Sequence, residues 1–126
     1  VADFLGNPPI NNFPGKVAGD DFVMADGSRV TLGLSGKVPE GTEVNLSVRA
    51  ESFVVESEQQ PDRLTCTVDS VYQMGKEEMA ILSFGGVHFR AYIASEYGFK
   101  PGDTVVLGLK DRGVFVFDLK TGERYI

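Results

Sequence analysis

The sequence PGDTVVLGLKDRGVFVFD, residues 101–118, follows the same pattern as GTEVNLSVRAESFVV, residues 41–55, without a gap. The superposition places Leu46 on Leu107, and each copy contains turn residues, an alternating segment, a short charged turn and a second apolar segment. That plan predicts a β-hairpin in each copy. An internal repeat at this spacing indicates a duplicated half-domain, in which neither half buries its apolar face without the other.

The rest of the chain also has a period of two. Alternating segments bounded by turn residues fill 16–34 and 64–93, and the Asp-Gly pair at 26–27 is a strong hairpin signal. A single helical turn is expected at 94–99, ended by Gly98. The pattern gives about ten short strands and predicts an all-β fold, a small barrel or sandwich.

The length of 126 residues fits one domain, large enough to bury roughly two-thirds of its unfolded surface. We place the barrel at 14–126, with halves at about 14–58 and 64–118, and assign 1–13 to a helix end and a linker. The single cysteine, Cys66, alternates with apolar neighbours and is predicted to be a buried, inert thiol. Since no membrane-spanning run or secretion leader occurs in the sequence, a soluble cytoplasmic domain is expected.

The first six residues, VADFLG, have apolar side chains at helical spacing and precede two prolines, as at the end of a helix. Because no helix start precedes them, we expect that the sequence begins inside a helix and that a larger protein continues upstream. Residues 7–15 contain three prolines and cannot be helical. Two interpretations stay open for this segment, a tether packed on its own barrel or an interdomain joint, and both use the same apolar anchors and amide side chains: Ile10, Asn11, Asn12 and Phe13.

No catalytic or metal-binding signature occurs in the sequence. The Gly-Lys pairs lack the other residues of a phosphate-binding loop, and His88 with Cys66 cannot form a usual metal centre. The net charge of −6 and the scattered basic residues disfavour nucleic acid as a partner. Several aromatic residues are therefore predicted in the core rather than on a base-stacking platform: Phe84, Phe89, Tyr92, Tyr97 and Phe99.

Four parts of the sequence resemble the ATP-binding subunits of carbohydrate-type ABC importers. The opening VADFLGNPPINNF resembles the junction where a helix of the nucleotide-binding domain ends and a Pro-x-Met-Asn stretch follows, with Ile10 in place of Met. LSVRAE, residues 46–51, is similar to the family's Gly-Ile-Arg-Pro-Glu signature, with Ala50 in place of Pro. VYQMGKE at 71–77 resembles a Val-x-x-Leu-Gly-x-Glu turn. KPGD and FDLKTGER, near the end, resemble closing Pro-Gly-Asp and Phe-Asp-x-x-Thr-Gly-Glu segments.

The resemblance implies a C-terminal regulatory domain of the maltose and glycerol-3-phosphate importer ATPase family, with a TOBE or MOP-like barrel of the oligonucleotide-binding (OB) type. It implies a non-catalytic domain with no cofactor of its own, because ATP and Mg would bind the ATPase domain that this sequence lacks. The implied partners are that upstream ATPase domain, a second copy in a homodimer, membrane permease subunits reached through the ATPase domain, and in some cases a regulatory protein. The implied location is the cytoplasmic face of the membrane.

An alternative function from a different class is the binding or sensing of a small oxyanion such as molybdate, although no Ser-Ala-Arg-Asn-type segment occurs. The segment 114–117 is apolar on both faces, so one face needs a cover from 10–13, from 119–126 or from a partner. Gly75 is expected at a strand-to-strand turn with positive φ. The candidate interdomain or interface residues are Pro9, Ile10, Asn11, Asn12, Phe13, Arg49, Glu51, Gly75, Phe115 and Phe117.

Overall fold

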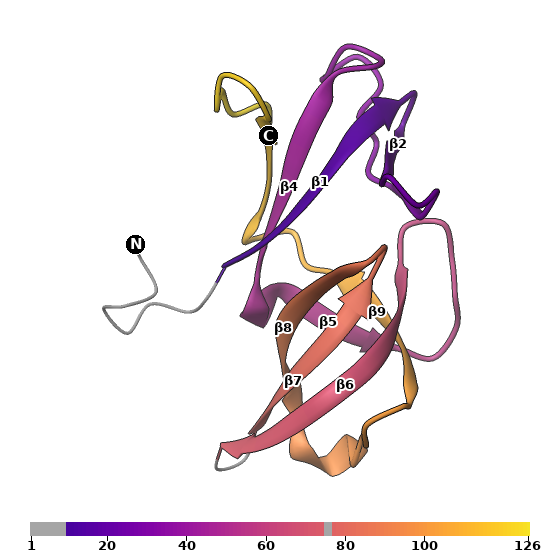
Figure 1. Ribbon diagram of the computed structural model, residues 1–126, viewed down its shortest axis with the longest axis vertical. Helices are drawn as coiled ribbons and strands as arrows, with labels where there is room; N and C mark the ends of the chain where they lie inside the picture. Colours follow the sequence, from indigo (N-terminus) through magenta and orange to yellow (C-terminus); the bar gives the residue numbers. More distant parts are fainter. Residues whose placement is uncertain (1–9, 75–76) are drawn as a thin grey trace.

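A computed structural model describes residues 10–74 and 77–126, and this part of the chain forms ten strands in two five-stranded antiparallel sheets (Figure 1). The all-β, OB-like barrel predicted from the sequence is confirmed. The strands are β1 (Ile10–Ala18), β2 (Asp21–Val23), β3 (Arg29–Thr31), β4 (Glu43–Arg49), β5 (Phe53–Glu56), β6 (Leu64–Met74), β7 (Glu77–Phe84), β8 (Val87–Ala94), β9 (Thr104–Leu109) and β10 (Val114–Asp118). Single 3-10 turns follow β4, as η2 (Ala50–Ser52), and β8, as η3 (Ser95–Tyr97).

The two sheets are related as a duplication. The first sheet has the order β10-β4-β1-β2-β3 and the second has the order β5-β9-β6-β7-β8. Each strand of the first half therefore corresponds to the strand five places later in the chain. Equivalent strands of the two sheets pair in the same register. The row Val17–Phe22–Val30 in the first sheet matches Val68–Leu82–Phe89 in the second, and every member is buried.

The fifth strands of the two halves are exchanged, so the predicted hairpins at 41–55 and 101–118 are wrong. β5 leaves β4 and pairs with β9, while β10 pairs with β4. The chain changes sheets at two equivalent turns, which are joined by reciprocal bonds: the Arg49 amide donates to the Gly113 carbonyl and the Lys110 amide to the Ser52 carbonyl, each at 2.8 Å. The repeated pattern of apolar residues predicts that both strands exist. It does not distinguish pairing within one half from pairing between the halves, because the pattern is the same in both cases.

One apolar core lies between the sheets and includes residues of both halves. Phe13 of β1 is fully buried there and makes edge contacts with Phe84 and Phe89, with ring centroids 6.4 and 5.2 Å apart. Burial of a side chain of this size contributes about 2–3 kcal/mol. Tyr97 departs from the core prediction, since it is half exposed and stacks on Phe99.

The start of β1 corrects the linker assignment. Residues 10–13 are strand, because they pair with 46–49 of β4 and bury Phe13. The expectations for residues 1–9, including Pro9, and for Gly75 lie outside the described residues. The Asp-Gly turn is confirmed, with Gly27 at φ 93° between β2 and β3. Among the described residues, no helix is long and apolar enough to cross a membrane.

Candidate interaction surface

Five of the candidate residues meet on one face of the first sheet, the side away from the core. The pairing of β10, β4 and β1 sets Phe115 beside Ser47, which in turn lies beside Asn12, and sets Phe117 beside Asn45. We call this surface the outer face of the first sheet. Its members are Ile10, Asn12, Pro14, Asn45, Ser47, Arg49, Phe115 and Phe117.

Two phenylalanines of β10 form the apolar part of this face. The Phe115 and Phe117 rings lie 6.1 Å apart, and the Arg124 guanidinium lies over the Phe115 ring at 4.8 Å. Both phenylalanines are half-buried. A guanidinium over an aromatic face contributes about 0.5–1 kcal/mol at an exposed site. Of the three covers left open for this strand, 119–126 thus supplies part: Arg124 lies over Phe115 and its backbone bridges Phe117, while both rings stay half-buried.

The final segment reaches β10 because a turn at Asp118 reverses the chain. One carboxylate oxygen of Asp118 accepts from the amides of Lys120 and Thr121, at 2.8 and 2.9 Å, and the other accepts from the Tyr125 hydroxyl at 3.0 Å. The returning chain then pairs with Val116, whose amide donates to the Ile126 carbonyl and whose carbonyl accepts from the Tyr125 amide. The Phe-Asp-x-x-Thr-Gly segment therefore places Arg124.

These contacts shift two pKa values in opposite directions. The Thr121 and Lys120 amides stabilise the ionised carboxylate and lower the pKa of Asp118. The same carboxylate accepts the Tyr125 hydroxyl and raises the pKa of Tyr125. The turn is therefore more stable while Asp118 is ionised.

Hydrogen-bonded polar side chains occupy the middle of the outer face. Asn12 Oδ1 accepts from Asn45 Nδ2 at 2.8 Å and from Ser47 Oγ at 2.7 Å. Ser47 is nearly inaccessible although it lies on this face, because larger side chains flank it. Hydrogen bonds within the face hold the side chains of Asn12, Asn45 and Ser47 in place. The two phenylalanines and these polar neighbours therefore form a pre-ordered surface.

Asn11 and Phe13 point the other way and serve the barrel. Asn11 is buried and joins the first sheet to the edge of β8: its Nδ2 donates to the Arg90 carbonyl at 2.8 Å and the Val48 carbonyl at 3.2 Å. Its Oδ1 accepts from the Arg90 amide at 2.9 Å. A side-chain amide thus pairs with an edge strand as a backbone amide would. This role of Asn11 depends on a contact with Arg90, far along the chain, so no local pattern in the sequence could indicate it.

The equivalent face of the second sheet has different chemistry. Val54 of β5 takes the position of Phe115, and Glu56 takes that of Phe117. The Glu56 carboxylate lies over Gly108, where an added Cβ would approach it to 2.6 Å, and it pairs with Arg63 at 3.5 Å. The duplication has therefore left an aromatic face on one sheet and a charged, self-paired face on the other.

Arg49 and Glu51 line a hollow of about 450 Å³ beside the outer face, at the two turns where the chain changes sheets. Lys110 and Arg112 come from the second of these turns and line the same hollow, together with Phe115. The sequence repeat, which aligns Arg49 with Lys110, already suggested that these positions correspond.

The remaining reactive groups do not form a catalytic arrangement. Cys66 is buried, and burial raises the pKa of its thiol to about 12. His88 is exposed and bonds through Nδ1 to Asp69 at 2.7 Å. Within the described ranges, no three His, Cys, Asp or Glu side chains are placed to hold a metal ion.

An exchanged pair of half-barrels in two five-stranded sheets defines the class of small OB-type β-barrel domains. The chain belongs to the TOBE domain family, whose sequence pattern matches residues 46–117. In fold it is similar to the cytoplasmic molybdate-binding protein ModG in a molybdate-bound crystal form, with a TM-score of 0.67 and 20% identity over 84% of this chain and 94% of that one.

Curated relatives match along nearly the whole chain. The sn-glycerol-3-phosphate import ATP-binding protein UgpC of Shigella boydii serotype 4 (strain Sb227) is 26% identical over 126 residues, which is 98% of this chain and 35% of that protein. UgpC of Escherichia coli O1:K1 / APEC is 27% identical over 128 residues, with the same coverage. The chain thus spans about a third of the length of these relatives.

Proposed function

We propose that this domain is the non-catalytic regulatory and dimerisation domain of the ATP-binding subunit of an ABC importer for sugars or related solutes. Membership of the TOBE family and the similarity to UgpC along 98% of the chain support this assignment. The observation that carries it is the outer face of the first sheet, where Phe115 and Phe117 remain partly exposed in a pre-ordered surface. Aromatic side chains of this kind are enriched in protein interfaces.

In this proposal the partners of the domain follow from its position at the C-terminal side of the ATP-binding subunit. The upstream ATPase domain is covalently attached and binds ATP and Mg, while this domain binds neither. Two copies associate through the outer face, and the ATPase domains connect them to permease subunits on the cytoplasmic side of the membrane. A regulatory protein is a further proposed partner, and the basic hollow at Arg49 is open to one.

Sedimentation of this chain across a concentration series tests the self-association. We expect a weak dimer, micromolar or looser, because the isolated domain retains only part of the subunit's contact area. Phe115→Ser should weaken the dimer, whereas Val54→Ser, at the equivalent position of the second sheet, should not. A strict monomer at millimolar concentration would reject self-association and leave the ATPase domain as the partner of this face.

A second candidate function, oxyanion binding, is supported by the shared fold with a molybdate-binding protein. Calorimetric titration of the domain with molybdate, tungstate and sulfate separates the two functions. Saturable binding of molybdate and tungstate with no effect of Phe115→Ser on oligomeric state would favour the sensor over the dimerisation domain.

A further inference from the structure

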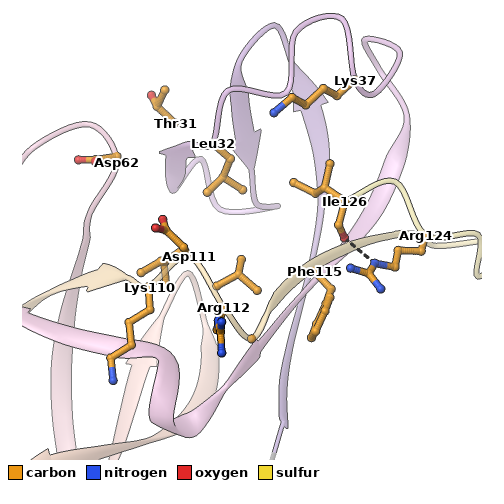
Figure 2. A pocket seen from close by; sticks show the side chains of 13 residues that line it. Thr31, Leu32, Lys37, Asp62, Lys110, Asp111, Arg112, Phe115, Arg124 and Ile126 are labelled. Carbon is orange, nitrogen blue, oxygen red and sulfur yellow. Dashed lines mark hydrogen bonds between the residues drawn. The ribbon is translucent and has the colours of Figure 1, made fainter.

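A cavity of about 720 Å³ opens between the two halves of the barrel, next to the hollow at Arg49, with which it shares the turn between β9 and β10. Its other walls come from the end of β3 and the loop that follows, the loop between β5 and β6, and the C-terminal segment (Figure 2). The bottom consists of aliphatic side chains that are half-buried against the core: Leu32, Leu109, Val114 and Ile126. This surface suits an aliphatic group rather than a sugar or a bare ion.

Charges of opposite sign line opposite sides of this cavity. Figure 2 places Asp111 and Asp62 on one side and Lys37 and Arg124 on the other, with Leu32 and Ile126 between them. The side chains of Lys110 and Arg112 are directed away from the cavity in the same view.

The charges that face the cavity are not neutralised within the protein. Among the described residues, no ion pair joins the side chains of Lys37, Asp62 or Asp111 to any other group. Arg124 is positioned by its Nε, which donates to the Ile126 carbonyl at 3.2 Å, so its terminal N–H groups stay available. The arrangement therefore has a fixed cationic side and an anionic side across an apolar bottom.

A ligand with one charge would meet repulsion on one side. An anion would be attracted to Lys37 but opposed by Asp111, and a cation would face the reverse. A molecule with an ammonium group at one end, a carboxylate at the other and an aliphatic body complements the anionic side, the cationic side and the apolar bottom of the cavity. We propose that this cavity binds an aliphatic zwitterion, either a free amino acid or a short peptide.

The volume favours the short peptide, since a cavity of this size exceeds what a single amino acid fills. The peptide ammonium lies at Asp111, the carboxylate at Lys37 and Arg124, and the side chains on Leu32 and Val114. The site needs only this domain, so it stands or falls independently of the transporter assignment.

Calorimetric titration of this chain with leucine, the dipeptide Leu-Val and the tripeptide Leu-Val-Leu tests the proposal. We expect saturable binding of at least one peptide more tightly than of leucine. N-acetylation, which removes the ammonium, and C-terminal amidation, which removes the carboxylate, should each weaken that binding by about 1.5- to fivefold, the range for a solvent-accessible ion pair. Leucine binding as tightly as the peptides would assign the site to free amino acids.

Two variants test which charged side chain binds each end of the peptide. Lys37→Gln should weaken binding of the unblocked peptide but not of the C-terminally amidated peptide. Asp111→Asn should weaken binding of the unblocked peptide but not of the N-acetylated peptide. Lys120→Gln serves as the control, because Lys120 does not line the cavity, is highly exposed and pairs with Glu43 at 3.6 Å. Methyl chemical shifts of Leu32, Val114 and Ile126 should move on titration of the unmodified protein. No binding at about 10 mM ligand, equal binding of the blocked peptides, or shifts confined to other methyl groups would overturn the proposal.

Discussion

Replacement of Asn11 by alanine tests the contact that joins the first sheet to the edge of β8. The change removes two donated hydrogen bonds and one accepted bond, and leaves both backbone groups of Arg90 without their partner. Each neutral hydrogen bond contributes about 0.5–1.5 kcal/mol net, and water can reach the part-buried Arg90 groups after the change. We therefore expect a loss of about 2–3 kcal/mol, which lowers the melting temperature by about 10 °C in a domain of this size.

Thermal and urea unfolding followed by circular dichroism measure the effect. The matched control is Asn45→Ala, because Asn45 donates one exposed bond to Asn12, where water replaces it, and one to Ser47, which keeps its own bond to Asn12. We expect the control to lose less than about 1 kcal/mol. Equal melting temperatures for the two variants would refute the role that we assign to Asn11.

Asn11→Asp separates hydrogen bonding from packing. The new carboxylate still accepts from the Arg90 amide but sets a negative oxygen against the carbonyls of Arg90 and Val48. Its pKa should rise above that of a free carboxyl group, so the neutral form is favoured in the folded state. Stability should then be highest at acid pH and fall as the pH rises, opposite to the usual behaviour of a surface carboxylate.

Three further outcomes are expected. Cys66 should resist Ellman's reagent in the native protein and react fully in denaturant, since burial raises its thiol pKa to about 12. Rapid labelling of the native protein would contradict this. Any loss of stability from ionisation of the thiol should begin only above about pH 9. Asp118→Ala should speed hydrogen exchange at the Tyr125 and Val116 amides. In the unmodified protein the protection of the same amides relative to a free peptide should fall only in acid, because the lowered pKa of Asp118 keeps the carboxylate ionised above the ordinary carboxyl value of 3.8; unchanged protection would show that the turn does not hold the tail. The chain should neither bind nor hydrolyse ATP, since the phosphate-binding groups are missing from its sequence; micromolar affinity in a titration would contradict that expectation.

The sequence was sufficient for the architecture because its signals are local or periodic. Alternation located the strands within 16–34 and 64–93, the Asp-Gly pair at 26–27 marked the turn between β2 and β3, and the repeat identified two equivalent halves. The pairing of the fifth strands could not be predicted in this way. β5 and β10 occupy equivalent positions, and the choice between partners depends on the direction of the chain after η2 rather than on side-chain pattern.

The candidate interface was predicted in part. Phe115, Phe117, Arg49 and Ile10 share a face because strand register brings distant segments together, whereas the sequence showed only that 114–117 is apolar on both faces. Phe13 failed as an interface residue because its side chain fills the barrel. The opposed charges of the further cavity lie on separate loops and a turn, so no spacing in the sequence links Lys37 to Asp111.

The exchange of fifth strands also sets when this domain can fold during synthesis. The first sheet lacks its β10 edge until residues 114–118 have left the ribosome, and β5 has no partner until β9 appears. Pairing of segments so far apart in sequence requires closure of long loops before any contact stabilises them, which favours slow folding. A nascent chain stalled before β9 should therefore remain sensitive to protease along its whole length, and two chains emerging together could trade β10 to give an entangled dimer.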